Sequence, residues 1–534
     1  MIRISDIRIP AAPREAELQA LEAKLNKLLG IKMPVWRVAR QSLDARKKPE
    51  ILSVYSLDVD LGCPETEAAF LHRKRKLKAS ILQDKNYEIP RYRGTKSPRV
   101  IVVGAGPAGL FSALILAQAG LKPLLIEQGA PVEERQRDVE AFWQGDALKP
   151  WSNVQFGEGG AGTFSDGKLS SGIRDKEGRI AFMLETFIRA GAPERIRWEA
   201  KPHIGTDVLR QVVKGIREEI LEAGGSIRFH TRMTDLLQTE GRVTGIAVQD
   251  TEEGHFQTLP ADALVLAPGH SARSLFRLLQ EKGVPMEAKA FALGLRIQHP
   301  QAQIDAMQYG PNPPAFLPAA DYKLAARAAD GRGVYSFCMC PGGYVVNASS
   351  EEGRLCVNGM SEAARDGVNA NAAIVVQIRP EDTEAEGLFG GLFFQERMEE
   401  AAWKAGKGRI PLQLWEDFVH NKTSQTLGQV APACKGAWAF ANLREFLPEF
   451  VSRALRDAMP QFGNTLPGFD RGDSLLCGIE SRTSSPLRIL RDEGGESSIR
   501  GLFPCGEGAG YAGGITSAAV DGIKTAEAVV SALS

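Results

Sequence analysis

An uninterrupted apolar run is the clearest feature in the pattern of hydrophobic and polar positions. Residues 100–103 are Val-Ile-Val-Val, which is typical of a buried strand. A glycine-rich turn follows, and the mostly apolar residues 108–119 predict a helix that Gly120 ends. Residues 121–126 predict a second strand. A strand, a turn, a helix and a strand in this order predict a nucleotide-binding unit.

The residues before this unit predict a small α+β domain, which we place at 1–83. Leu18, Leu21, Leu25 and Leu28 have helical spacing, so we expect a helix over 15–29. Apolar clusters predict strands over 2–9, 35–39 and 51–59. Residues 84–98 carry two prolines and several charges, and we expect a linker there.

The rest of the chain divides into three parts. Residues 99–285 complete the nucleotide fold with a helix over 206–223, strands between 226 and 248, and a buried strand in 262–270 that brings Gly269 near a ligand. Residues 286–465 repeat no nucleotide signature, so we expect an inserted α+β cap or substrate domain. Its predicted strands are 333–346 and 354–360, and its predicted helices lie in 362–377, 396–405 and 446–459. Residues 466–534 return to the first fold and end in a predicted helix over 516–533.

The glycine-rich turn has the residues that a pyrophosphate site needs. Gly104 permits the tight turn, Gly106 lets the backbone approach a phosphate, and Gly109 lets the helix pack on the strand. Pro107 and Ala108 complete the turn and open the helix, whose N-terminus attracts anions. These five residues are candidate cofactor ligands.

An acidic residue follows the second predicted strand. Glu127 stands where a ribose hydroxyl pair is bound in such units, and its charge disfavours a 2′-phosphate. The nucleotide is therefore predicted to be FAD or NAD.

A second glycine-rich loop spans residues 156–169. So much glycine predicts backbone held close to a flat or phosphorylated ligand. We include Gly160, Gly162, Thr163 and Lys168 among the cofactor-binding candidates, and Ser165 is a further hydrogen-bonding group.

Composition excludes several classes of protein. The 534 residues are 43% hydrophobic and 24% charged, as in an ordinary globular protein, and no apolar run is long enough to cross a membrane. Without a signal-peptide core at the N-terminus, we expect a cytoplasmic location. The seven cysteines are scattered, so reduced thiols are expected and no metal motif is found. Cys338 and Cys340 are a redox pair, half of a metal site or buried small hydrophobes, and we favour the last.

The neutral net charge hides a basic N-terminal region. Residues 1–100 hold 21 Lys and Arg against 12 Asp and Glu, with clusters at 46–48 and 73–76. Such clusters attract nucleic acid, an acidic partner or an anionic substrate, but a solvated helix face is the favoured interpretation.

The C-terminal segment narrows the nucleotide to a flavin. Residues 501–515 give a strand, a Gly-Glu pair and a glycine turn before the last helix. Together with the first glycine turn, this resembles the FAD-binding superfamily of the glutathione-reductase type. The resemblance implies that Gly506 and Glu507 bind the ribitol or pyrophosphate region and that the last helix points its N-terminus at the flavin, through Gly513, Gly514, Ile515 and Thr516. It also implies cofactor or bracing roles for Gln128 and Arg135.

Further sequence motifs are spread over nearly the whole chain, among them 337–343, 365–371 and 478–486. They resemble a bacterial family of FAD-dependent dehydrogenases whose substrate the resemblance does not supply. The implied fold class is α/β, a Rossmann-like FAD-binding fold with an inserted α+β cap and a small N-terminal α+β domain.

The chemistry is less defined than the cofactor. No cysteine lies in the helix after Gly109, which disfavours a disulfide reductase, and no second glycine motif provides an NAD(P)H domain. NAD(P)H would bind in the cap cleft, or a small organic substrate itself would reduce the flavin. Candidate catalytic groups are Lys168, Glu480, Arg482, Cys505 and Tyr511.

We expect an FAD-dependent oxidoreductase of the dehydrogenase type, which transfers a hydride between an organic substrate and non-covalently bound FAD. The alternatives are an RNA-modifying flavoprotein that uses the basic N-terminal region, and a non-enzymatic flavin-binding scaffold.

Overall fold

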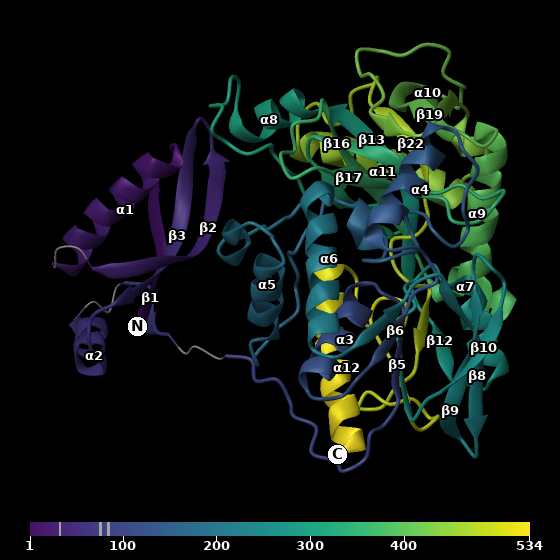
Figure 1. The fold of residues 1–534 in the computed structure, drawn as a ribbon. Helices are drawn as coiled ribbons and strands as arrows, with labels where there is room; N and C mark the ends of the chain where they lie inside the picture. The colour runs from purple at the N-terminus through teal and green to yellow at the C-terminus, as the bar shows by residue number, and fades with distance from the viewer. Residues whose placement is uncertain (31–33, 74–76, 83–85) are drawn as a thin grey trace.

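The N-terminal part is an antiparallel sheet covered by a helix. The computed structural model describes residues 1–30, 34–73, 77–82 and 86–534 (Figure 1). Alternate residues of β1, such as Ile2 and Ile4, pack with Leu21 and Leu25 of α1 in a small separate core. The sheet order is β2-β3-β1-β4. Its elements are β1 (Ile2–Pro10), α1 (Arg14–Leu29), β2 (Val35–Lys47), β3 (Glu50–Asp60), α2 (Pro64–Arg73) and β4 (Ala79–Ile81).

A parallel sheet of order β24-β11-β5-β6-β7 forms the nucleotide-binding part. Its strands are short and buried, because helices cover the sheet, with α3 and α12 packed side by side at its centre (Figure 1). The strands are β5 (Val100–Val103), β6 (Leu124–Ile126), β7 (Ser226–Arg228), β11 (Ala263–Leu266) and β24 (Leu502–Pro504). The helices are α3 (Pro107–Gln118), α4 (Val132–Gln144), α5 (Arg179–Arg189), α6 (Thr206–Glu222), α7 (Arg273–Glu281) and α12 (Ile515–Leu533).

Parallel pairing brings the carboxyl ends of these strands to one edge. The turns after β5, β6, β11 and β24 therefore meet, although they are separated by up to 400 residues in the chain. An antiparallel sheet of β8 (Thr231–Thr239), β9 (Arg242–Asp250) and β10 (Phe256–Pro260) lies beside the parallel sheet.

The cap is built on a mixed sheet of order β14-β15-β18-β13-β22-β19-β21. Smaller sheets of order β17-β16-β20 and β12-β23 complete it and join it to the nucleotide-binding part. Its strands are β12 (Met286–Ala288), β13 (Phe291–Pro300), β14 (Ala325–Arg327), β15 (Gly333–Cys340), β16 (Gly343–Asn347), β17 (Val357–Ser361), β18 (Asn369–Ile378), β19 (Ile410–Leu414), β20 (Cys434–Lys435), β21 (Trp438–Phe440), β22 (Leu475–Glu480) and β23 (Leu487–Ile489). Its helices are α8 (Gln301–Tyr309), α9 (Gly390–Gly406), α10 (Trp415–Val419) and α11 (Glu449–Thr465).

Two expectations about the cap were wrong. The helix predicted within 362–377 is absent there, because residues 369–378 form the buried strand β18 between β15 and β13. The cap also extends past residue 465, since β22 pairs with β13 and β19 in the cap sheet rather than in the nucleotide sheet. Both errors come from pairing with distant strands, which local sequence patterns do not reveal.

The segment expected as a linker packs on the nucleotide-binding part. Tyr87, Ile89 and Tyr92 contact its core, and the Tyr92 amide donates to the carbonyl of Ala119 at 2.9 Å. Residues 83–85, where the expected domain boundary falls, lie outside the described residues. Within the described part of the chain, the helices are all too short or too polar to span a bilayer.

Candidate functional site

A cavity of about 850 Å³ lies between the carboxyl edge of the parallel sheet and the cap. Most of the residues singled out in the sequence line it, although they come from five separate loops and turns and from the cap. The lining candidates are Gly104, Gly106, Pro107, Ala108, Glu127, Gln128, Gly160, Gly162, Ser165, Lys168, Gly269, Glu480, Arg482, Cys505, Glu507, Gly513, Gly514, Ile515 and Thr516. Gly109, Arg135, Thr163, Gly506 and Tyr511 are not among the residues that line it.

The first glycine turn leaves no room for side chains. Gly104 has φ +97°, and a Cβ there would lie 2.3 Å from the carbonyl oxygen of Ala267. A Cβ at Gly109 would lie 1.8 Å from the carbonyl oxygen of Gly104. Helix α3 begins directly afterwards, with Gly106 as its N-cap and Pro107 in its first turn. The free amides of that helix end therefore open onto the cavity.

Glu127 ties three turns together. Its buried carboxylate accepts hydrogen bonds from the amides of Ala105 at 2.8 Å, Gly129 at 3.0 Å and Gly157 at 3.0 Å. A carboxylate has about four acceptor positions, so one remains beside the cavity. The predicted ribose contact would use that position.

Arg135 braces the second glycine loop instead of facing the cavity. Its fully buried guanidinium donates to carbonyl oxygens of residues 153, 154, 157, 158 and 160. It also lies over the ring of Phe164, 5.0 Å from the centroid. Of the two roles expected for Arg135, a phosphate contact or a structural brace, this geometry favours the brace. Thr163 is likewise buried and bonds within the loop, to the carbonyl of Glu158.

Lys168 meets the cap across the cavity. Its ammonium pairs with Asp166 at 2.9 Å and donates to the carbonyl of Met339 in β15. Arg365 pairs with the same carboxylate. Burial opposes the charge of Lys168, but Asp166 outweighs it and raises the pKa of the ammonium. Lys168 therefore contributes a fixed positive charge and is a poor proton donor at neutral pH.

The C-terminal glycine turn places an acid beside a histidine. Glu507 Oε1 lies 3.7 Å from Nδ1 of His270, which follows β11. Burial raises the pKa of Glu507 to about 7 and lowers that of His270 to about 3. The buried Nε2 of His270 has no hydrogen-bond partner. Sequence analysis missed His270, although it directly follows Gly269, which we had placed near the ligand.

The N-terminus of α12 closes this side of the cavity. Thr516 is buried and donates to the carbonyl of Leu169 at 2.8 Å, so it joins α12 to the second glycine loop. Gly513 and Gly514 have open space where a Cβ would stand. A ligand can therefore approach the backbone of this helix end closely.

The candidate catalytic groups differ in their surroundings. Arg482 is 9% exposed and donates to Glu399 at 2.8 and 3.0 Å and to Ser350 at 2.6 Å, so most of its donors are used within the protein. Burial raises the pKa of Cys505, which keeps this thiol protonated. Tyr511 lies outside the cavity, with the guanidinium of Arg491 3.7 Å from its ring centroid. Glu480 pairs with the buried Arg296 at 2.7 Å.

One cysteine of the Cys338-Met-Cys340 segment faces the cavity. Cys340 is fully buried, as the favoured interpretation expected, whereas Cys338 lines the cavity wall.

The cavity fits an FAD molecule. A Cβ at Gly160 would lie 3.0 Å from Cα of Gly106, so the two glycine turns form a narrow cradle that only bare backbone allows. Helix N-termini from α3 and α12 face the same space, and both suit anionic or electron-rich groups. The unpaired Nε2 of His270 offers a polar contact inside it.

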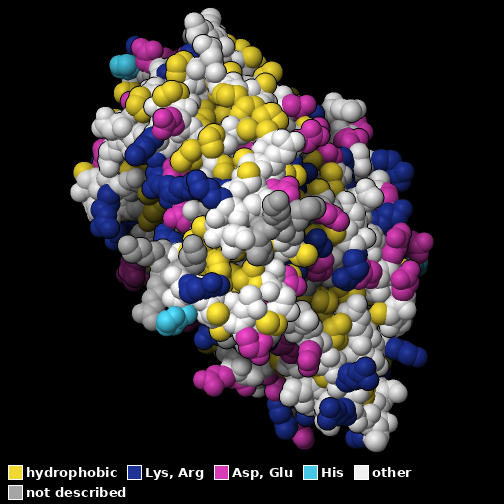
Figure 2. Space-filling view, turned by 90° about the vertical axis from the view of Figure 1, so that its left-hand side faces the viewer, with side chains coloured by type: hydrophobic (Ala, Val, Ile, Leu, Met, Phe, Trp, Pro, Cys, Tyr) yellow, Lys and Arg dark blue, Asp and Glu magenta, His cyan; other side chains and the backbone are white. Residues whose placement is uncertain are grey.

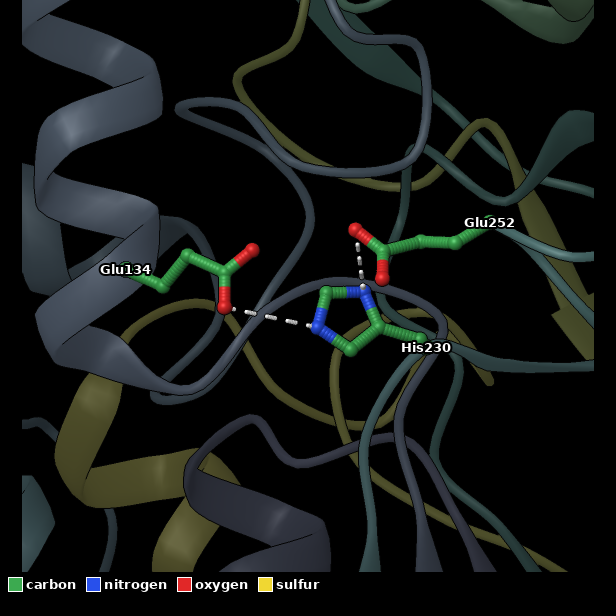
Figure 3. A group of neighbouring side chains, drawn as sticks. All are labelled: Glu134, His230 and Glu252. Carbon is green, nitrogen blue, oxygen red and sulfur yellow. Dashed lines mark ion pairs between the residues drawn. The ribbon is translucent and has the colours of Figure 1, made fainter.

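A separate group of side chains has the ligand types of a metal site. Glu134, His230 and Glu252 point toward one another outside the cavity (Figure 3). Their closest contacts are 3.6 Å to His230 Nε2 and 3.7 Å to its Nδ1, so the two carboxylates flank opposite ring nitrogens. The two carboxylates therefore contact different nitrogens of the ring and do not converge on one of them.

Comparisons with known proteins agree with the geometry. Family models match residues 98–296 (pyridine nucleotide-disulphide oxidoreductase), 290–483 (FAD-dependent protein, C-terminal domain-like) and 1–60 (a domain of unknown function, DUF8436). An "Uncharacterized protein" of Clostridium beijerinckii is 43% identical over 546 residues, which cover 99% of this chain and 98% of that protein.

Solved structures resemble the chain only weakly. Glycerol-3-phosphate dehydrogenase from Bacillus halodurans, complexed with FAD, is 11% identical with a TM-score of 0.36 over 82% of this chain and 64%, less than two thirds, of that chain. A geranylgeranyl bacteriochlorophyll reductase-like protein from Thermoplasma acidophilum is 15% identical with a TM-score of 0.37, over 82% and 79%. Such likenesses carry no argument about activity. The Clostridium relative shows family membership, and the family models describe that family: the chain belongs to a family of FAD-dependent oxidoreductases, with FAD as its cofactor.

Proposed function

We propose that the protein is a dehydrogenase-type flavoenzyme that transfers a hydride between a small organic substrate and non-covalently bound FAD. The observation that carries the proposal is the His270–Glu507 pair, which lies in the same cavity as both glycine turns. A hydride transfer is commonly accompanied by a proton, and a group with a pKa near 7 can give or take it at neutral pH.

The chain's own residues divide the work of holding the cofactor. In this proposal the 104–109 turn holds the pyrophosphate, Glu127 the ribose, and residues 513–516 the pyrimidine edge of the flavin. FAD, when bound, supplies the acceptor for an electron pair. The N-terminus of α12 stabilises negative charge on the reduced ring system through its free amides.

Glu507 is the proposed proton carrier, and His270 is the proposed hydrogen-bonding partner of the substrate. Burial lowers the pKa of His270 to about 3, so its ring is neutral and only weakly basic, and it can form a hydrogen bond with a hydroxyl or amine. Glu507, with a pKa of about 7, takes up the proton and exchanges it with solvent. Lys168 and Arg482 stay protonated, so they contribute positive charge to the cavity and do not transfer protons.

Anaerobic flavin reduction tests the proposal. The purified holoprotein is mixed with NADH, NADPH and a panel of hydroxy acids, amino acids and alcohols, and flavin absorbance is followed. At least one donor is expected to bleach the flavin, and His270→Asn is expected to slow that donor more than tenfold. His255→Asn, at an exposed position, is the matched control. Flavin that no donor reduces would favour the non-enzymatic scaffold.

The RNA-modifying alternative has no specific observation in its favour. Several basic side chains of the N-terminal domain are already paired, for example Arg46 with Asp44 at 2.6 Å and Arg3 with Asp58 at 2.7 Å. Figure 2 shows Lys and Arg interspersed with Asp and Glu on this side of the molecule. In the 73–76 cluster, residues 74–76 lie outside the described residues.

A further inference from the structure

The Cys338-Met339-Cys340 segment is bent so that its two thiols meet. In a regular strand, residues two apart point to the same face but stay separated. Here β15 has a bulge between Phe337 and Cys340 in its pairing with β18, and Cys338 has φ +43°. Cys338 is not a glycine, so this left-handed conformation is strained and must be held by its surroundings. The bend brings the two thiols within hydrogen-bonding distance.

Two cations contact the bend. Arg296 Nη1 donates to the carbonyl of Cys338 at 3.2 Å and lies 3.9 Å from the sulfur of Cys340. Lys168 donates to the carbonyl of Met339, between the two cysteines. The Cys340 sulfur also lies 3.3 Å from the carbonyl oxygen of Cys338.

The surroundings of the pair shift the pKa values of the two thiols in opposite directions. The hydrogen bond from Cys340 lowers the pKa of Cys338, and Lys168 and Arg296 lower it further against the effect of burial. The same hydrogen bond and burial raise the pKa of Cys340. Asp166, Glu480 and Glu507 are the nearby acids, and the first two are each paired with one of these cations. The lowered pKa of Cys338 beside the raised pKa of Cys340 favours one thiolate next to one thiol, which is the reactive form of a dithiol.

We propose that Cys338 and Cys340 are a redox-active dithiol that exchanges an electron pair with the flavin in the shared cavity, so that the physiological partner is a thiol or disulfide compound. This inference rests on the proposed oxidoreductase function and names a substrate class for it. The sequence had argued against a disulfide reductase because α3 contains no cysteine; the cap supplies the pair instead, with Cys338 lining the cavity and Cys340 buried behind it.

One thiolate and one thiol form an S–S bond between Cys338 and Cys340, and the proton of Cys340 is released to the flavin. The electron pair reduces FAD to its anionic dihydro form, and the reverse step reduces the disulfide. A substrate disulfide then exchanges with the dithiol, which leaves the substrate as two thiols and the protein as its disulfide.

A second cysteine pair provides the matched control. Cys434 and Cys477 both lie near Gln298, whose amide donates to their sulfurs at 3.7 and 3.2 Å. Neither lines the cavity. Cys434→Ser therefore removes a neighbouring cap thiol without touching the cavity wall.

Anaerobic titration with dithionite counts the electrons. Oxidised holoprotein is expected to take up two electron pairs per FAD, whereas Cys338→Ser and Cys340→Ser take up one and Cys434→Ser takes up two. Mass spectrometry of the wild-type protein before titration should find the Cys338–Cys340 disulfide. Uptake of a single pair by the wild type, with both thiols open to alkylation, would overturn the proposal.

Apoprotein gives a readout without flavin. In glutathione redox buffers the Cys338–Cys340 pair should form a disulfide, and after reduction Cys338 should be alkylated by iodoacetamide at pH 6, where an ordinary thiol with a pKa of about 8.5 is almost unreactive. If no disulfide forms at any poise while an organic donor still bleaches the flavin, the dithiol is wrong and the dehydrogenase stands. If the disulfide forms but no organic donor or nicotinamide bleaches the flavin, the opposite holds.

Discussion

The two walls of the cavity are built from different materials. The wall on the parallel sheet is rich in exposed glycine backbone, with Gly104, Gly106 and Gly514 facing the space beside a few polar side chains such as Glu127 and Glu507. The wall on the cap carries charged and polar side chains such as Glu480, Arg482 and Cys338. A backbone wall suits a cofactor of fixed shape, while a wall of side chains can be varied to choose the reaction.

The walls also differ in what keeps them in place. Steric fit fixes the backbone wall, because turns from different strands touch with no room for a Cβ. Ion pairs fix the cap wall, where buried Glu399 holds Arg273 at 2.7 Å and Arg482 at 2.8 Å. Buried charges of this kind are costly when one partner is lost. Substitutions in the two walls should therefore fail in different ways.

Gly109→Val gives the largest expected effect, because its side chain would clash with the glycine turn that forms the backbone wall. Its Cβ would lie 1.8 Å from the carbonyl of Gly104, so the turn must open. We expect the purified protein to carry almost no FAD, with affinity reduced about 100-fold or more for a loss near 3 kcal/mol. Flavin content and a binding titration measure this. Gly172→Ala is the control, since a Cβ there meets no atom within 4 Å. Normal FAD content in Gly109→Val would contradict the steric account.

Glu399→Gln tests the ionic wall. It leaves Arg273 and Arg482 buried with a weaker partner, so we expect the free energy of unfolding to fall by about 3–5 kcal/mol. Chemical denaturation measures the loss. Glu400→Gln, on the same helix, removes only a surface pair with Lys404 and should lower the free energy of unfolding far less. Equal losses in the two variants would show that the cap wall does not depend on its buried charges.

Glu507→Gln tests the raised pKa of the acid in the C-terminal glycine turn. The folded pKa of about 7 lies above the unfolded value of about 4.3, so the native state holds more protons between these values. The carboxyl therefore makes stability fall as pH rises from about 4 to about 7. Relative to wild type, the Gln variant should gain about 1–3 kcal/mol between pH 5 and pH 8. Parallel pH profiles for the two proteins would refute the shifted pKa.

Tyr511→Phe should have the smallest effect. The tyrosine packs on Arg491 outside the cavity, so loss of its hydroxyl should leave the rate of flavin reduction within about twofold of wild type. Stopped-flow reduction with dithionite and with the best organic donor measures the rate. A drop of tenfold or more would restore Tyr511 as a proton donor.

The two walls were not equally predictable. The strand, turn and helix around Gly104 to Gly109 are contiguous, so sequence patterns located them to within a residue or two. The predictions for the cap were wrong at β18 and β22, because these strands are defined by pairing with a strand far away in the chain. Arg135 was correctly placed near the second glycine loop, but it does not line the cavity. His270 was overlooked because its partner Glu507 lies 237 residues further along the chain.

The cofactor could be predicted from local sequence patterns, since the glycine spacing, Glu127 and the Gly506–Glu507 pair each act through local backbone geometry. Tertiary structure alone decided which side chains share the cavity. Lys168, Arg296 and the Cys338–Cys340 pair come from separate strands and loops, and only the folded sheet brings their charges and sulfurs together. Reactivity in this cavity depends on those distances, and a linear pattern does not carry them.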